Sequence, residues 1–105
     1  MEIIWTKSAR DDLNDYYQNS KILIDDKLNE YIDSMINYID TLSEMPCLGK
    51  VIGNIKDKEM RLVIYKMHKI LYSIEEEKIY LLAITHTARD YAKIIDYIHK
   101  YLQMK

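Results

Sequence analysis

The chain has 105 residues, of which 49% are hydrophobic and 30% charged, and its net charge is −2 at pH 7. This size and composition are typical of one globular domain with a single core, and they exclude an intrinsically disordered chain. No apolar run approaches the roughly 20 residues of a transmembrane helix, the N-terminus lacks the pattern of a signal peptide, and one cysteine cannot form an intrachain disulfide. We therefore expect one domain over residues 1–105, in the cytoplasm and without membrane contact.

The charge is distributed unevenly along the chain. Residues 1–45 carry ten acidic and four basic side chains, a net charge of −6, whereas residues 46–105 carry seven acidic and eleven basic ones, a net charge of +4. A positive C-terminal part permits a surface that faces nucleic acid. Two unevenly charged, solvated surfaces explain the charge equally well.

The N-terminal part predicts a strand followed by two helices. Residues 2–6 (EIIWT) are short, apolar and rich in residues that favour a strand. Ser8 begins a Ser-x-x-Asp variant of the capping box, which predicts a helix that ends near residues 19–20. Apolar residues at spacings of three and four predict a second helix over residues 24–42. Because few residues separate the helices, we expect an antiparallel helical hairpin that covers a sheet.

The C-terminal part predicts the sheet and a last helix. Pro46 ends the second helix, and residues 50–58 are expected to form a loop that could hold a short strand. Three strands are expected over residues 59–65, 68–75 and 78–86. The last of them is apolar on both faces and suits a central position. A second capping-box variant at residues 87–90 begins a helix. The order β-α-α-β-β-β-α predicts an α+β domain with a small, mainly antiparallel sheet.

Element order and several local patterns together resemble a known family. The patterns lie, in chain order, in residues 5–13 (WTKSARDDL), the Pro46…Gly49 loop, Arg61, residues 69–74 (KILYSI) and residues 84–90 (ITHTARD). In this order, residues 1 to about 91 resemble the RelE/ParE superfamily, the toxins of bacterial type II toxin–antitoxin pairs. The resemblance implies a small toxin that a cognate antitoxin neutralises by wrapping around it. Members are mainly ribosome-dependent messenger-RNA endonucleases or inhibitors of DNA gyrase.

Cleavage of RNA by its adjacent 2′-hydroxyl needs a proton acceptor, a proton donor and cations that stabilise charge on the phosphate. Arginine and lysine can provide the cations, so no metal or cofactor is expected. Within the resemblance, Arg61 would hold the phosphate through two parallel hydrogen bonds. His86 would transfer protons near neutral pH, and Arg89 would face a phosphate from the first turn of the last helix. Each could instead be structural, as Arg61 would be in an ion pair with Glu59 or Glu75.

Three further side chains are candidates for substrate binding. Lys69 could contact phosphate, and the rings of Tyr65 and Tyr72 could stack on bases. Their convergence depends on strand register. A two-residue turn at residues 66–67 places Arg61 opposite Tyr72 and on the other face from Lys69, whereas a three-residue turn places Arg61 and Lys69 on one face. The sequence leaves both registers open, because neither Gly nor Asn identifies the turn.

Other reactive side chains are expected to have no catalytic role. Cys47 is expected to be a small buried residue. His68 and His99 are expected to face solvent or to flank the site.

The leading hypothesis is therefore a RelE/ParE-like toxin that acts as a metal-independent messenger-RNA endonuclease on translated messages. Inhibition of DNA gyrase is the alternative: His86 favours cleavage, and the long last helix favours binding to a protein. A third hypothesis is a non-enzymatic module that binds an antitoxin, since an isoelectric point of about 5.9 leaves little positive charge for phosphates. The last helix could also join two copies or contribute to a toxin–antitoxin hetero-oligomer.

Overall fold

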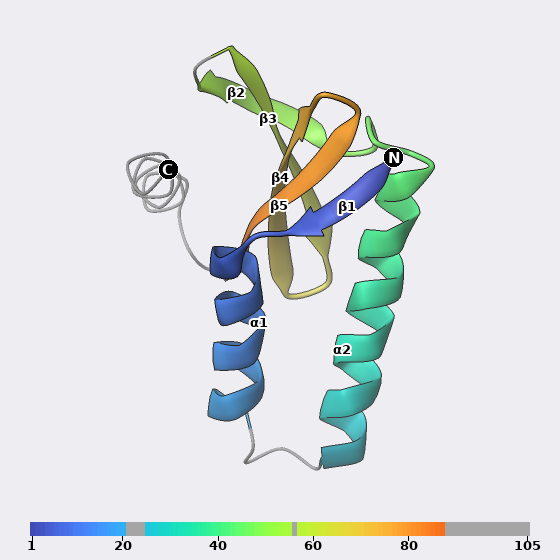
Figure 1. Cartoon of the computed structure of the whole chain (residues 1–105). Coiled ribbons are helices and arrows are strands. Elements are labelled where there is room, and N and C mark those ends of the chain that lie inside the picture. Colours follow the sequence, from blue (N-terminus) through green and yellow to red (C-terminus); the bar gives the residue numbers. More distant parts are fainter. Residues whose placement is uncertain (21–24, 56, 88–105) are drawn as a thin grey trace.

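The structure, a computed structural model, describes residues 1–20, 25–55 and 57–87 (Figure 1). Its elements are β1 (Glu2–Trp5), α1 (Lys7–Asn19), α2 (Asp25–Asp40), a short 3-10 helix η1 (Thr41–Ser43), β2 (Lys50–Ile55), β3 (Lys58–Tyr65), β4 (His68–Glu75) and β5 (Lys78–His86). The five strands form one sheet in the order β1-β5-β4-β3-β2. β1 is parallel to β5, and the other pairs are antiparallel. The expected α+β fold is confirmed, and the helix expected after residue 87 lies outside the described residues.

Thr6 joins the first strand, the first helix and β5. Its backbone N–H and its hydroxyl donate to the carbonyl of Leu81 at 3.3 and 2.6 Å, and its Oγ1 accepts from the N–H of Ala9 at 3.2 Å. Thr6 is therefore the N-cap of α1, which begins at Lys7. The prediction that Ser8 caps this helix is wrong, because the hydroxyl at the end of β1 already satisfies the first turn and Ser8 lies within that turn.

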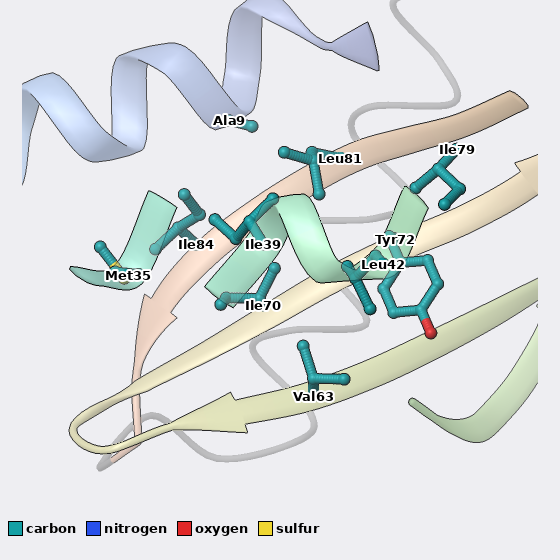
Figure 2. Packing of buried hydrophobic residues seen from close by; sticks show 10 residues of the cluster. All are labelled: Ala9, Met35, Ile39, Leu42, Val63, Ile70, Tyr72, Ile79, Leu81 and Ile84. Atoms are coloured by element: carbon teal, nitrogen blue, oxygen red, sulfur yellow. The ribbon is translucent and has the colours of Figure 1, made fainter. Parts of the chain in front are cut away.

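The two helices run antiparallel and cover one face of the sheet (Figure 1). The apolar stripe of α2 packs on β3, β4 and β5. The predicted antiparallel helical hairpin that covers a sheet is therefore confirmed. The buried cluster between helices and sheet consists of Ala9, Met35, Ile39, Leu42, Val63, Ile70, Tyr72, Ile79, Leu81 and Ile84 (Figure 2). Neither α1 nor α2 has the length and apolarity that crossing a membrane would require.

The opposite face of the sheet also carries buried apolar side chains. A second cluster there consists of Met60, Leu62, Leu71, Leu82 and Ala83. A β-bulge displaces the pairing at this point, since Leu71 pairs with Ala83 whereas Tyr72 pairs with Leu81. β5 is thus an interior strand with buried side chains on both faces, as its apolar sequence predicts.

The segment between the second helix and β3 forms an edge strand. β2 pairs antiparallel with β3, and a register shift between Val51 and Gly53 marks a second bulge. Bulges at sheet edges limit pairing with foreign strands. The short strand allowed for within residues 50–58 is therefore present, at the edge of the sheet.

A two-residue turn at residues 66–67 sets the register of β3 against β4. Arg61 pairs with Tyr72, which is the first of the two registers considered above. Directly paired residues share a face, so Arg61 and Tyr72 both face the helices while Lys69 lies on the other face. Lys66 has a φ of 50°, a conformation usually supplied by Gly, Asn or Asp. The lysine at this position explains why the sequence does not reveal the turn.

The core placement of α2 can be tested with one truncation. Ile39 is fully buried, so Ile39→Ala should lower the free energy of unfolding by about 2–5 kcal/mol through lost burial and the cavity left behind. The matched Ile64→Ala removes the same atoms from a residue that is 56% exposed and should cost about 1 kcal/mol or less. Urea denaturation followed by circular dichroism measures both, and equal losses would contradict this core.

Candidate functional site

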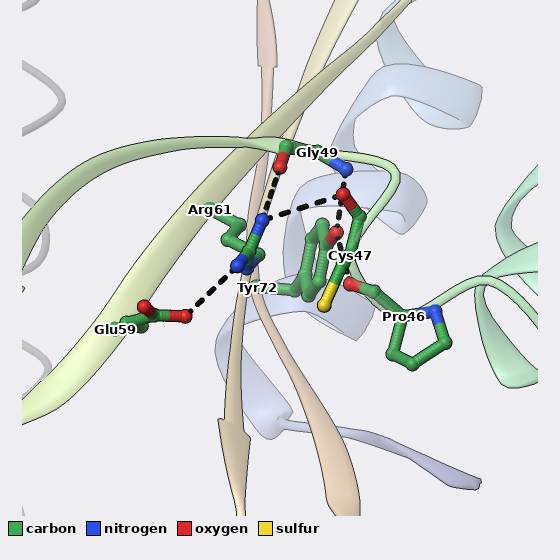
Figure 3. Close-up of polar contacts among 6 residues, drawn as sticks. All are labelled: Pro46, Cys47, Gly49, Glu59, Arg61 and Tyr72. Atoms are coloured by element: carbon green, nitrogen blue, oxygen red, sulfur yellow. Dashed lines mark hydrogen bonds and ion pairs between the residues drawn. The ribbon is translucent and has the colours of Figure 1, made fainter.

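Arg61 holds the loop that follows the helical hairpin. Its Nη1 donates to the carbonyls of Gly49 at 2.7 Å and Cys47 at 3.3 Å (Figure 3). Its Nη2 lies 3.0 Å from Oε2 of Glu59, and only 14% of the Arg61 side chain is exposed. The ion pair with Glu59, one of the two structural alternatives expected for this arginine, is therefore present. Both terminal nitrogens of the guanidinium are bound to protein oxygens.

Tyr72 holds the same loop from β4. The ring is fully buried, and its hydroxyl donates to the carbonyl of Pro46 at 2.6 Å and accepts from the N–H of Gly49 at 2.8 Å (Figure 3). Burial raises the pKa of Tyr72, so the hydroxyl keeps its proton. A Cβ on residue 49 would lie 2.7 Å from this hydroxyl and 3.0 Å from the carbonyl of Leu62. Gly49 is therefore required by close approach. Together, Arg61 and Tyr72 form what we call the loop anchor.

His86 belongs to a different group of side chains, which we call the tyrosine–histidine cluster. Its members are Tyr16, Tyr31, Tyr65, His68 and His86, one from each of α1, α2, β3, β4 and β5. The centre of the cluster is His68, which is 3% exposed. The centroid of its ring lies 4.4 Å from the ring centroid of Tyr16 and 6.0 Å from that of His86. Its Nδ1 lies 2.8 Å from the hydroxyl oxygen of Tyr31.

The surroundings of His68 disfavour its charged form. Burial lowers the pKa of His68, and the adjacent His86 lowers it further. Burial raises the pKa of Tyr31. At neutral pH the centre of the cluster is thus a neutral imidazole beside a protonated phenol. His86, at the exposed end of β5, is the member of this pair that solvent or a substrate can reach.

Arg61 and His86 lie on the same face of the sheet but far apart. Arg61 is level with Tyr72, whereas His86 is level with His68, which pairs with Tyr65. From residue 61 to residue 65, β3 extends about 13 Å, and β3 and β5 are separated by two strand spacings, about 9–10 Å. The two side chains therefore do not meet at one phosphate in this structure.

The remaining predicted site residues do not join Arg61. Lys69 pairs with Ile64 and Thr85 and lies on the other face of the sheet. The ring of Tyr65 packs against that of Tyr38 with centroids 5.1 Å apart. Tyr72 has no exposed surface for stacking on a base. Arg89 lies outside the described residues.

Two expectations about reactive side chains are wrong. Cys47 is exposed, because its loop is held through backbone carbonyls and its side chain is left at the surface. His68 is buried, because the two-residue turn places it opposite Tyr65, on the face that the helices cover. Gly49 could have been identified as a special position only from its place in the family pattern, since its constraint comes from a ring 23 residues away.

The loop anchor makes a measurable contribution to stability. Tyr72→Phe removes the acceptor of the Gly49 N–H and should lower the free energy of unfolding by about 1–3 kcal/mol, because a buried donor is left unpaired. The control Tyr17→Phe removes a hydroxyl that makes no hydrogen bond to any described residue and should change stability by less than about 0.5 kcal/mol. Urea denaturation compares the two, and an unchanged Tyr72→Phe protein would contradict the anchor.

Comparison with known proteins agrees with this architecture. The model of a family described as "ParE toxin of type II toxin-antitoxin system, parDE" matches residues 3–91. Among solved structures, the chain is similar to one described as "Chromosomal ParDE TA system from P. aeruginosa", with a TM-score of 0.67 and 16% sequence identity over 82% of this chain and 95% of that chain. At this identity the likeness concerns the fold. No curated protein sequence matches the chain. Because the family match spans most of its length, the chain belongs to the ParE toxin family of type II toxin–antitoxin systems.

Proposed function

We propose that this toxin arrests bacterial growth by inhibiting DNA gyrase and that a cognate antitoxin neutralises it by binding. The observation that carries the choice of target is the engagement of Arg61. Its guanidinium is bound to Gly49, Cys47 and Glu59, so it serves the loop rather than a substrate. Membership of the ParE family supports the same choice.

Messenger-RNA cleavage would place demands on Arg61 and His86 that this arrangement does not meet. A phosphate-binding arginine and a proton-transferring histidine must both lie within hydrogen-bond reach of the reacting group. Here the two residues are separated by about 13 Å along the strands. Arg61 would also have to exchange its contacts with Gly49, Cys47 and Glu59 for the phosphate. Inhibition by binding a protein needs no such convergence.

The anchored loop supports a protein-binding role. Met45, Leu48 and Val51 lie within one short stretch and are 41–55% exposed. Exposed apolar side chains that are close together are typical of surfaces that bind other proteins. Arg61 and Tyr72 fix the backbone that carries these residues, so little conformational freedom would be lost on binding.

Messenger-RNA cleavage is the second candidate function, and one observation favours it. His68 and His86 lie with their ring centroids 6.0 Å apart, and Lys66 is in the adjacent turn. His86, the exposed imidazole of the pair, would exchange protons with the reacting group, and Lys66 would contribute positive charge. In that case the site would be centred on His86 and would not include Arg61.

Two assays with purified toxin distinguish these functions. The gyrase assay contains relaxed plasmid, ATP and gyrase, and the cleavage assay contains a message undergoing translation. We expect the toxin to block supercoiling and to leave the message intact. His86→Asn should block supercoiling within about threefold of the wild-type concentration, less than 1 kcal/mol, because the proposal gives its imidazole no part in binding gyrase.

The controls identify the source of each effect. Plasmid incubated with toxin but without gyrase should be unchanged, which excludes contaminating nucleases. New ends on the translated message, lost in His86→Asn, together with unaffected supercoiling would replace the gyrase proposal with cleavage. If expression of the folded chain leaves growth, supercoiling and messages all unaffected, the proposal is wrong, and binding to an antitoxin is the function that is left.

A further inference from the structure

The tyrosine–histidine cluster lies where both helices meet one end of the sheet, and the proposed function does not use it. The C-terminal half of α1 and the N-terminal half of α2 project past the β3–β4 turn (Figure 1). Tyr16 and Tyr31 come from these projecting halves, and both contact the buried ring of His68. His68 therefore lies at the junction between the helical hairpin and the sheet.

The hydrogen bonds of the cluster are satisfied by a neutral His68 that carries its proton on Nε2. The hydroxyl of Tyr31 accepts from the N–H of Met67 at 3.3 Å. Its one proton can go to Nδ1 of His68 at 2.8 Å or to the carbonyl of Tyr65 at 3.4 Å. We assign the proton of Tyr31 to the shorter contact, which places the proton of a neutral His68 on Nε2. A neutral His68 thus receives the hydrogen bond that joins α2 to β4.

A proton added to His68 reverses this bond. Nδ1 becomes a donor, so the hydroxyl of Tyr31 must accept from it and turn its own proton to the longer contact with Tyr65. Tyr31 would then accept two hydrogen bonds and keep one donor contact, at 3.4 Å. The charged ring would also lie edge to face with Tyr16 in a buried position. Protonation therefore weakens the hydrogen bond between α2 and β4 and leaves a charge buried under both helices.

The charged groups around His68 do not compensate for a proton. β5 contributes His86, with its ring 6.0 Å away, and the β3–β4 turn contributes Lys66, whose Nζ lies 6.0 Å from the centre of the Tyr31 ring. His86 lowers the pKa of His68, and Lys66 adds no negative charge that could stabilise a protonated ring. From α1, Asp12 approaches the end of β5, but its Oδ2 accepts the backbone N–H of Ile84 at 2.9 Å. α2 and β3 contribute the phenols of Tyr31 and Tyr65.

We propose that His68 is a proton-operated clasp that holds the helical hairpin against the sheet when it is neutral and loosens it when it is protonated. The clasp is a property of the fold and does not depend on which target the toxin binds. Mild acidification would then open the junction locally, since the main core takes Ala9 from the first turn of α1 and Met35 and Ile39 from the C-terminal half of α2, whereas the cluster takes Tyr16 and Tyr31 from the projecting halves. A pH-sensitive hairpin would change the surface that the toxin offers to a partner.

The direction of the pH dependence follows from linkage. The pKa of His68 is lowered in the folded protein, so the unfolded or opened state binds the proton more tightly. The stabilisation by the clasp is therefore complete above the ordinary histidine value of about 6.5. This stabilisation is lost as the pH falls from that value through the pKa of His68 in the folded protein. Because one proton is involved, the equilibrium constant for opening rises by no more than about tenfold per pH unit.

Nuclear magnetic resonance on the full chain tests the clasp directly. The ¹⁵N shifts of the His68 ring should show the neutral form with its proton on Nε2 at pH 7.5. Amide hydrogen exchange, corrected for the intrinsic effect of pH, should show protection in residues 13–19 and 27–34 falling several-fold between pH 7.5 and 5.0 while protection in β4 and β5 is retained. A His68 that titrates at or above its ordinary value, or a uniform loss of protection, would overturn the proposal.

Three variants separate the clasp from ordinary acid destabilisation. Tyr31→Phe removes the donor to neutral His68, and His86→Asn removes the neighbouring imidazole that lowers the pKa of His68, so each should raise the pKa of His68. The control Tyr17→Phe removes a hydroxyl from α1, next to Tyr16 but outside the cluster, and should leave the titration unchanged. His68→Phe should abolish the pH dependence of hairpin protection. If His68→Phe folds and keeps that dependence, the clasp is wrong. If it does not fold, the wild-type titration and the two pKa shifts still decide.

Discussion

The hydroxyl of Tyr72 is the contact on which the arrangement of the candidate site depends. It is the polar end of a side chain whose ring belongs to the main core, and it binds the loop through both a carbonyl and an N–H. These bonds hold the loop over β3, where Arg61 donates to the carbonyls of Cys47 and Gly49. The exposed apolar residues of the loop are thereby attached to the rigid centre of the domain.

This anchoring changes how the basic residues of a small toxin are understood. An arginine on a strand, near a tyrosine and in a sheet with a histidine at one end, has the composition of a ribonuclease site. The structure distributes these residues between the loop anchor and the tyrosine–histidine cluster, and each group has its own structural purpose. The ParE family match is consistent with a member of the wider superfamily in which the same positions support the fold. Residue types alone therefore do not establish that these side chains form one site.

The sequence predicts the elements well and the site poorly, for physical reasons. Apolar residues at spacings of three and four identify α2, because such a stripe must be buried against another element. The apolar sequence of β5 identifies an interior strand, because both of its faces must be covered. The register at residues 66–67 is not predictable, since a lysine occupies a position with a φ of 50° that usually holds Gly or Asn. Arg61 and Tyr72 bind mainly backbone groups of the loop. The pattern of side chains in a sequence does not reveal such backbone partners.

The parallel pairing of β1 with β5 has a consequence for the synthesis of the toxin. Thr6 and Leu81 are 75 residues apart, and their bonds both cap α1 and attach β1 to the sheet. During translation the first strand and its helix emerge long before their partner strand exists, so this edge of the domain cannot form co-translationally until β5 has left the ribosome. At roughly 5–20 residues per second, that interval lasts some seconds. A nascent chain in this state exposes its apolar helical stripe, and an antitoxin already present could engage the toxin before its fold is complete.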